Sequence, residues 1–241
     1  MGEPETTNQK PETLRAAYCD IDGTLAATTI AGPLLWYKRR LLSAHAHACW
    51  MAGLCWRAPY WLLLDYFSRQ ASNRAIYSHY AGFDAARVKE LAAECYNAEI
   101  KPRLFPLALE RLRALQQDGL RLAFVTGGVD FLMQPLAANL HAELIAPALE
   151  ERNGLFTGRL QGPPLTGAHK ADAVRAHAQT HGIALAESFA FGDAIGDLRL
   201  LECVGHPVAV NADRRLAAIA QARGWQRENW KAQSQGIMPK P

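Results

Sequence analysis

The chain has 241 residues, 49% of them hydrophobic and 20% charged, and a formal net charge of only +3. This is the composition of an ordinary globular protein, which excludes the fibrous and wholly disordered classes. Its basic residues form no stripe with interleaved aromatic residues, so the sequence predicts no nucleic-acid partner.

The N-terminal residues and the cysteines indicate the cellular compartment of the protein. Residues 1–12 are polar and lack the apolar stretch of a signal peptide, so we expect a disordered lead-in there. The five cysteines show no paired metal-ligand spacing and are odd in number, which favours free thiols in a reducing compartment. The sequence therefore predicts a cytoplasmic protein.

The first predicted strand spans residues 14–19 and leads directly into an acidic stretch. This stretch is Asp20-Ile21-Asp22-Gly23-Thr24. Residues two apart in an extended chain share a face, so we expect Asp20 and Asp22 to point the same way. Two carboxylates about 4 Å apart repel by roughly 4 kcal/mol at an effective dielectric constant of about 20. We therefore expect a divalent cation at the end of this strand, where its positive charge offsets the repulsion between the carboxylates.

Residues 28–101 read almost entirely as helix, and we expect them to form an inserted helical cap. Pro59 is expected to divide two apolar helices of this cap, because proline removes a backbone hydrogen bond and clashes with the preceding turn. Asp84 is expected to be the N-cap of a later helix that carries Val88 and Leu91 on one face.

One segment of the cap, residues 41–56, contains no Asp, Glu, Lys or Arg and directly follows the basic cluster Lys38-Arg39-Arg40. It falls short of the roughly 20 apolar residues that a transmembrane helix needs. We interpret the segment as a buried helix within the cap. The alternative is a helix that lies on a membrane surface.

From residue 102 onward the pattern alternates between strands and helices. Strands are expected at 121–125, around 189 and at 207–210, helices over 107–118, up to about 139, over 169–181 and after Asp213, and a hairpin at Asn153-Gly154. The alternation predicts an α/β fold, with a Rossmann-like, mostly parallel sheet and helices on both faces. We expect its core to comprise residues 13–27 and 102–225, followed by a polar tail over 226–241.

Polar and charged residues follow the later strands. Thr126 and Gly127 come directly after one strand and offer a hydroxyl and backbone N–H groups to a phosphoryl oxygen. Asp193 and Asp197 follow another strand, and Lys170 opens the helix before it. The carboxyl ends of the strands form the ligand crevice of an open α/β sheet, so we expect these side chains to meet there. An all-oxygen acidic site that also holds a phosphate suits Mg²⁺.

The order of these motifs resembles that of a known family. The set consists of Asp20-x-Asp22-Gly-Thr, Thr126-Gly-Gly, Lys170 and Gly192-Asp193-x-x-x-Asp197, and it is similar to the haloacid dehalogenase (HAD) superfamily of phosphatases. The helical insert, the double glycine after Thr126 and the stretch from Phe156 to Pro163 resemble the phosphoserine-phosphatase-like branch, subfamily IB. The similarity covers about residues 14–225.

The resemblance implies a role for each matched residue. Asp20 is the implied nucleophile, which becomes an aspartyl phosphate. Asp22 is the implied general acid and then the base for the attacking water. The residues implied to hold Mg²⁺ are Asp20, Asp22 through its backbone carbonyl, Asp193 and Asp197. Those implied to bind the transferring phosphoryl group are Thr126, Gly127 and Lys170.

Some positions depart from the family pattern or are candidates for substrate contact. Phosphoserine phosphatases carry a glutamate shortly after the first motif, and this chain has Thr28 or Thr29 there, which argues against phosphoserine. Many relatives have asparagine where this chain has Gly196, so we expect a different arrangement of the outer metal shell. In the cap, Arg69 and Arg74 are candidates for gripping a carboxylate or phosphate, and the alternative is that both are surface arginines.

The sequence therefore predicts a Mg²⁺-dependent phosphomonoesterase that acts on a small phosphorylated metabolite through an aspartyl phosphate. One alternative is a phosphotransferase that passes the same phosphoryl group to an alcohol acceptor. The other is a membrane-surface phosphatase or binding module for a lipid headgroup, docked through residues 38–56. The sequence makes no prediction of the oligomeric state.

Overall fold

A parallel sheet of six strands organises the protein, in the order β3-β2-β1-β6-β7-β8. The computed structural model describes residues 13–231, so the predicted lead-in over residues 1–12 lies outside the described part. The strands are β1 (Ala16–Cys19), β2 (Arg121–Val125), β3 (Glu143–Ile145), β6 (Phe189–Gly192), β7 (His206–Val210) and β8 (Gln226–Glu228). In the centre of the sheet, the strand register pairs Cys19 with Phe124 of β2 on one side and with Phe191 of β6 on the other. The predicted α/β class is confirmed.

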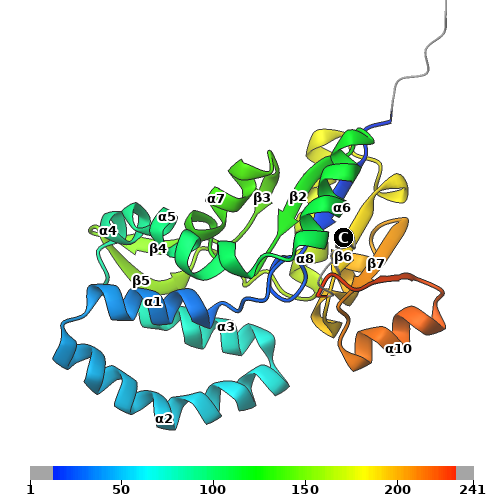
Figure 1. The fold of residues 1–241 in the computed structure, drawn as a ribbon. Coiled ribbons are helices and arrows are strands. Elements are labelled where there is room, and N and C mark those ends of the chain that lie inside the picture. The colour runs from blue at the N-terminus through cyan, green and yellow to red at the C-terminus, as the bar shows by residue number, and fades with distance from the viewer. Residues whose placement is uncertain (1–12, 232–241) are drawn as a thin grey trace, which may run out of the picture.

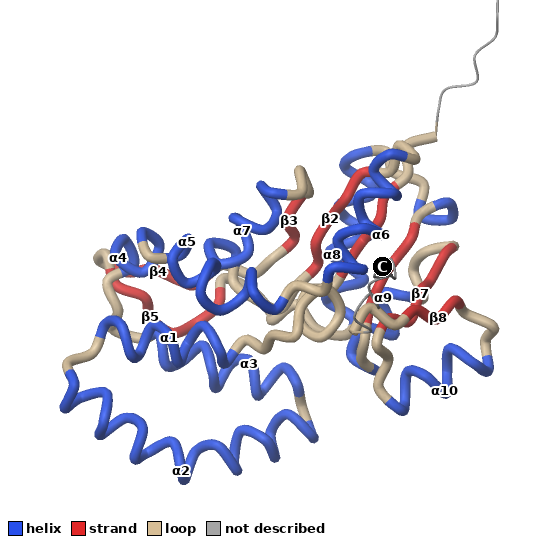
Figure 2. The backbone as a smooth tube through the Cα atoms, in the orientation of Figure 1, coloured by secondary structure: helices blue, strands red, loops and turns tan. Residues whose placement is uncertain are grey.

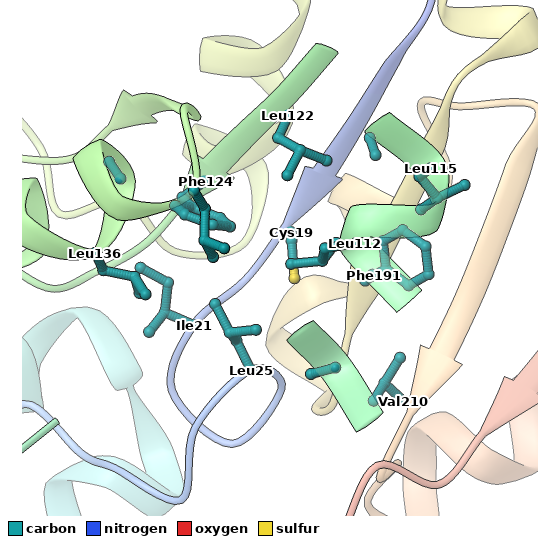
Figure 3. Close-up of a cluster of buried hydrophobic side chains, with 14 of the residues drawn as sticks. Cys19, Ile21, Leu25, Leu112, Leu115, Leu122, Phe124, Leu136, Phe191 and Val210 are labelled. Atoms are coloured by element: carbon teal, nitrogen blue, oxygen red, sulfur yellow. The ribbon is translucent and has the colours of Figure 1, made fainter. Parts of the chain in front are cut away.

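Helices cover both faces of this sheet (Figure 2). One face carries α6 (Pro106–Gln117) and α7 (Asp130–Asn139), and the other carries α8 (Ala168–His181), α9 (Leu198–Leu201) and α10 (Arg214–Ala222). Strand side chains alternate between the two cores, because successive residues of a strand point to opposite faces. Figure 3 shows the first core, which contains Cys19, Phe124 and Phe191 from the strands together with Leu112 and Leu136 from the helices.

The cap is a second hydrophobic unit beside the sheet (Figure 1). Its elements are α1 (Ala31–Leu41), α2 (Ala44–Phe67), α3 (Arg69–Tyr77), η1 (Ser78–Tyr80), α4 (Ala85–Glu90), α5 (Ala92–Cys95), η2 (Tyr96–Ile100) and η3 (Lys101–Arg103). Asp84 caps α4 by accepting a hydrogen bond of 2.8 Å from the Arg87 backbone N–H, as predicted. Val88 and Leu91 are buried on the face predicted for them.

The predicted hairpin forms, but it packs with the cap. It consists of β4 (Leu149–Arg152) and β5 (Leu155–Leu160), which we had placed in the core range. The Phe156 backbone N–H donates to the Phe83 carbonyl at 2.9 Å, and the Phe156 carbonyl accepts from Gly82 at 2.9 Å. Phe156 is also buried in the cap cluster. The cap is therefore completed by a segment far from residues 28–101 in the chain.

The prediction that Pro59 separates two helices is wrong. α2 runs through Pro59 as one helix of 24 residues, with Ser43 accepting a hydrogen bond from the Ala46 backbone N–H at its start. A proline removes one hydrogen bond of the helix, and the turns on either side can persist, so the outcome here is a bend instead of a break. Figure 1 shows α2 as an arc.

The interpretation of residues 41–56 as a buried helix is also wrong. None of these residues is buried, and the Trp56 side chain is 87% exposed. The helix is apolar around most of its circumference, and the small cap covers only part of it; Trp50 and Trp61 pack against the cap cluster. Within residues 13–231, no helix combines the length and apolar character that crossing a membrane requires.

The predicted polar tail begins too early, because its first residues belong to the sheet. Gln226–Glu228 form β8, which pairs in parallel with β7. Trp230 is 3% exposed, and its ring centroid lies 5.3 Å from that of Phe191. Its indole N–H donates to Glu228 at 2.7 Å, and its backbone N–H donates to the Asn211 side chain at 2.8 Å. Short polar strands carry no periodic signal, which is why the sequence pattern missed β8.

Replacing Trp230 with alanine is expected to lower the free energy of unfolding by about 3–5 kcal/mol, because it leaves a cavity beside Phe191. Urea denaturation followed by circular dichroism measures the change. The matched control is Trp56→Ala, at an exposed position, with an expected change within about 0.5 kcal/mol. Equal effects of the two substitutions would contradict the buried role of Trp230.

Candidate active site

The predicted acidic residues meet at the point where the strand order reverses. β1 is the first strand in the chain and lies between β2 and β6 in the sheet. Asp20 follows β1, Thr126 follows β2 and Asp193 follows β6, so all three lie at the carboxyl edge of neighbouring strands. In open α/β sheets this reversal leaves a crevice between the loops, where ligands bind.

A lysine bridges two of the carboxylates. The Lys170 Nζ, at the start of α8, donates to Asp20 Oδ1 at 2.6 Å and to Asp197 Oδ1 at 2.6 Å, and all three side chains are buried. The Thr24 hydroxyl donates to Asp20 Oδ2 at 3.1 Å and contacts Asp193 Oδ1 at 3.4 Å. Three segments separated in the sequence thus form one hydrogen-bonded cluster.

Most of this cluster lines a cavity of about 350 Å³. The catalytic candidates that line it are Asp20, Asp22, Gly127, Lys170, Asp193 and Asp197. Asp22 comes from the same loop as Asp20, and its Oδ1 accepts a hydrogen bond of 2.7 Å from Thr28. Both aspartates line the cavity, as expected, whereas Ile21 between them is fully buried in the core.

The electrostatics of the site show a shortage of positive charge. Burial raises the pKa of Asp20 to about 8, even though Lys170 opposes the shift, and the neighbouring carboxylates of Asp197 and Asp193 add to it. Burial, together with Asp197, raises the pKa of Asp193 to about 6. Burial also raises the pKa of Asp22. One lysine does not compensate this many buried carboxylates, so the site favours a further cation.

The carboxylates are placed where one ion can reach them. Ligand oxygens of Asp20, Asp193 and Asp197 all lie within 4.8 Å of one another. Hard divalent cations prefer oxygen ligands of this kind, and Mg²⁺ commonly binds through a few carboxylates together with substrate phosphate. The residues present therefore fit the predicted Mg²⁺.

Two glycines are required by close packing within the site. Gly23 has a φ of +86°, and a Cβ atom there would lie 2.1 Å from Asp193 Oδ2. A Cβ atom on Gly192 would lie 2.6 Å from the Asp197 Cβ. Any larger residue at either position would displace a carboxylate of the cluster. The two motifs thus need their glycines as well as their aspartates.

Thr126 and Gly127 take different places in the structure. The Thr126 side chain is fully buried, and its hydroxyl oxygen accepts from the Gly128 backbone N–H at 2.9 Å, which shapes the loop. Gly127 lines the cavity, and its carbonyl accepts a hydrogen bond of 2.6 Å from the Tyr77 hydroxyl of α3. The loop after β2 is thereby tied to the cap.

The two arginines selected in the cap do not share a location. Arg69, the first residue of α3, lines the cavity, and its positive charge opposes the burial that raises the pKa values of Asp22 and Asp193. Arg74 is exposed and is not among the residues that line the cavity. The prediction of a substrate contact is therefore carried forward for Arg69 alone.

Sequence reasoning missed two polar residues of the cavity wall. Ser72 and Asn73 are buried side chains on α3 that line the cavity. The amide of Asn73 lies close to Gly127, since a Cβ atom on that glycine would be 3.1 Å from Asn73 Nδ2. Residues three and four apart share a helix face, so the spacing of Ser72 and Asn73 from Arg69 is the signal that identifies them.

A buried aspartate held by a lysine, at the reversal point of a parallel sheet, defines an α/β enzyme with an acidic active site. A family model described as haloacid dehalogenase-like hydrolase matches residues 17–202. The chain belongs to this family. The predicted superfamily is thus confirmed.

Similar proteins agree with this assignment. Phosphoserine phosphatase SerB1 of Mycobacterium tuberculosis is 29% identical over 216 residues, which cover 88% of this chain and 69% of that protein. A crystal structure of a Bordetella pertussis protein of unknown function has a TM-score of 0.78 and 27% identity, covering 90% of this chain and 99% of that chain. A phospho-aspartyl intermediate analogue of a phosphoserine phosphatase shares the fold, with a TM-score of 0.66, 18% identity and coverage of 91% and 94%. The protein is a phosphoric monoester hydrolase.

Proposed function

We propose that the protein is a Mg²⁺-dependent phosphomonoesterase that cleaves a small phosphorylated substrate through an aspartyl phosphate at Asp20. The observation that carries the proposal is the contact of Asp20 with Lys170 at 2.6 Å inside a cavity lined by further carboxylates. A carboxylate is a nucleophile when it is ionised and correctly placed, and a covalent intermediate divides one difficult displacement into two easier ones.

The acidic cluster would hold the metal. Asp20, Asp193 and Asp197 supply carboxylate oxygens, and we propose the backbone carbonyl of Asp22 as a further ligand. When bound, Mg²⁺ supplies positive charge that polarises the phosphoryl oxygens and offsets the repulsion between phosphate and carboxylates. Lys170 contributes to the same charge balance through its hydrogen bonds to Asp20 and Asp197.

The chain's own residues account for the bonds and protons of the reaction. In the first step an Asp20 carboxylate oxygen bonds to phosphorus, and the bond from phosphorus to the ester oxygen breaks. Asp22 donates its proton to that leaving oxygen, which suits a carboxyl whose pKa is raised by burial. In the second step Asp22 takes a proton from water, and the water oxygen bonds to phosphorus. The bond between phosphorus and the Asp20 oxygen breaks, which releases inorganic phosphate and regenerates the Asp20 carboxylate.

Positioning of the phosphoryl group would fall to Lys170, Gly127 and Arg69, which line the cavity. The exposed backbone of Gly127 can approach a phosphoryl oxygen closely, as in other loops that bind anions. The guanidinium of Arg69 can bind two phosphoryl oxygens at once. We propose that the buried Thr126 hydroxyl acts indirectly: its hydrogen bond with the Gly128 backbone N–H holds the loop that presents Gly127.

The experiment is hydrolysis of p-nitrophenyl phosphate by the purified protein after removal of metal with a chelator. We expect no turnover until Mg²⁺ is added and release of inorganic phosphate afterwards. Added glycerol distinguishes the phosphatase from the phosphotransferase alternative, because transfer to glycerol would yield glycerol phosphate in place of free phosphate. Full activity in the presence of excess chelator would contradict the metal requirement, and no activity with Mg²⁺ would contradict the proposed function.

The Mg²⁺ requirement is expected to depend on pH. Burial raises the pKa of Asp20 to about 8 and that of Asp193 to about 6, so protons occupy these ligands more as the pH falls through that range. Metal binding must then release them. The Mg²⁺ concentration for half-maximal activity should therefore rise between about pH 8 and pH 6, by up to about tenfold per pH unit for each proton displaced. A constant requirement over this range would contradict the prediction.

A further inference from the structure

The active-site cavity is lined by two chemically different groups of residues. One group consists of the carboxylates and Lys170. The other group is mainly apolar and consists of Ile30, Ala58, Trp61, Leu62, Ile76 and Leu165, beside the polar residues Ser72 and Asn73 of α3. The cleaved phosphorus must lie at Asp20, so the leaving group of the substrate occupies the rest of the cavity. Most of that remaining wall is apolar and therefore suits hydrocarbon, because polar groups placed against it would lose hydrogen bonds to water without replacement.

Among the cap residues whose side chains the structure describes, no carboxylate lines the cavity to pair with a substrate ammonium group. The charged residue in that set is Arg69, and its charge is positive. Its charge counters the effect of burial on the pKa of Asp22, which places it near the catalytic carboxylates. A buried ammonium group requires an anionic partner. Thr28, near the position at which phosphoserine phosphatases carry glutamate, donates its hydroxyl hydrogen bond to Asp22. The described cap side chains therefore give an amino-acid leaving group no anionic partner.

The apolar wall of the cavity reaches the protein surface at Leu62. Leu62 lines the cavity and is nevertheless 73% exposed, so it stands at the opening. The same half of α2 exposes Trp56, Leu63, Tyr66 and Phe67. An exposed apolar surface of this kind marks a binding site for an apolar partner. A chain too long for the cavity would leave it past Leu62 and meet an apolar surface outside.

We propose that the substrate is a phosphate monoester whose leaving group carries an aliphatic chain, with the phosphate at Asp20 and the chain along Trp61 and Leu62. This inference rests on the proposed phosphatase function and specifies its substrate class. The bonds made and broken are those of the proposed reaction, and the products are inorganic phosphate and an aliphatic alcohol. The exposed part of α2 shields the portion of the chain that extends beyond the cavity.

The test is a series of n-alkyl phosphates from ethyl to octyl phosphate, assayed with Mg²⁺ by phosphate release. Each methylene buried in the cavity should raise kcat/KM by about three- to fourfold until the cavity is filled. O-phosphoserine should be a poorer substrate than octyl phosphate. A flat or falling series, or a preference for O-phosphoserine, overturns the inference. Turnover of p-nitrophenyl phosphate in the same preparation shows whether the phosphatase function itself stands.

A variant at the cavity opening tests the path of the chain. Leu62→Asn should lower the ratio of kcat/KM for octyl phosphate to that for ethyl phosphate by about tenfold, because a polar group replaces the apolar wall. Leu155→Asn is the matched control, since Leu155 is exposed on β5 and does not line the cavity. The control should keep the wild-type ratio. An unchanged ratio in Leu62→Asn overturns the proposed path.

Two further assays distinguish a substrate dissolved in water from one held in a membrane. Monomeric octyl phosphate represents a dissolved amphiphile, and lysophosphatidate in phosphatidylcholine vesicles represents a membrane lipid. Turnover of the vesicle-bound lipid assigns the exposed face of α2 to contact with a bilayer. Turnover of the dissolved ester alone assigns it to soluble amphiphiles. Either result supports the substrate class, and turnover of neither overturns it.

Discussion

Asp20→Asn is expected to lower kcat by on the order of 10⁴-fold or more, the usual effect of removing a catalytic nucleophile. Asparagine keeps the shape of aspartate, but its neutral amide cannot attack phosphorus. The substitution also removes one of the three carboxylates whose oxygens lie within 4.8 Å of one another. Mg²⁺ binding should weaken together with the rate. Steady-state assays and Mg²⁺ titration measure the two effects separately.

The matched control for this substitution is Asp172→Asn, two residues beyond Lys170 in α8. Asp172 is exposed and pairs with Arg175 at 3.0 Å, so its charge lies outside the cavity. Its replacement should leave kcat within a factor of about two, as exposed ion pairs contribute little. Substantial activity in Asp20→Asn, at saturating Mg²⁺ and with intact folding, would eliminate Asp20 as the nucleophile.

Lys170→Met is expected to impair both catalysis and folding. Methionine has a similar length but removes both 2.6 Å hydrogen bonds and leaves Asp20 and Asp197 without their cation. Breaking a buried pair in this way costs about 3–5 kcal/mol of folding stability. The loss of charge near the transferring phosphoryl group should lower kcat by about 10²- to 10³-fold. Thermal unfolding and steady-state assays measure the two effects.

Added Mg²⁺ separates the two roles of Lys170. Bound cation at the carboxylates should restore much of the stability of Lys170→Met, since it replaces the missing positive charge, whereas the rate should stay low. Lys89→Met is the control, because Lys89 is exposed and pairs with Glu151 on the surface. It should change stability by less than about 1 kcal/mol. Wild-type stability of metal-free Lys170→Met would contradict the structural role assigned to this lysine.

The catalytic end of the site could be predicted from the sequence because its residues follow the ends of strands. Asp20, Asp193 and the loop at Thr126 come after runs of apolar residues, and parallel strands bring their carboxyl ends to one edge. The order of the motifs assigns Lys170 to the site, because a lysine at the start of a helix does not by itself indicate a functional residue. The structure brings these four positions together.

The cap end could not be predicted in the same detail, because tertiary packing decides it. Pro59 breaks an isolated helix in principle, yet α2 continues through it. Arg69 and Arg74 look equivalent in the sequence, and only the orientation of α3 places Arg69 in the cavity wall. The hairpin containing Phe156 is recognised by its turn, but its contact with Phe83 joins segments more than seventy residues apart.

The central claim, a phosphoryl group carried by Asp20, is tested most directly with Asp22→Asn and p-nitrophenyl phosphate. This leaving group needs little protonation, so the intermediate should form while its hydrolysis, which requires the base, slows. Rapid acid quench, digestion and mass spectrometry then locate the phosphoryl group. We predict one phosphoryl group on the peptide that contains Asp20, released by hydroxylamine. Nitrophenol release without a labelled peptide, or a label on another residue, would contradict the claim.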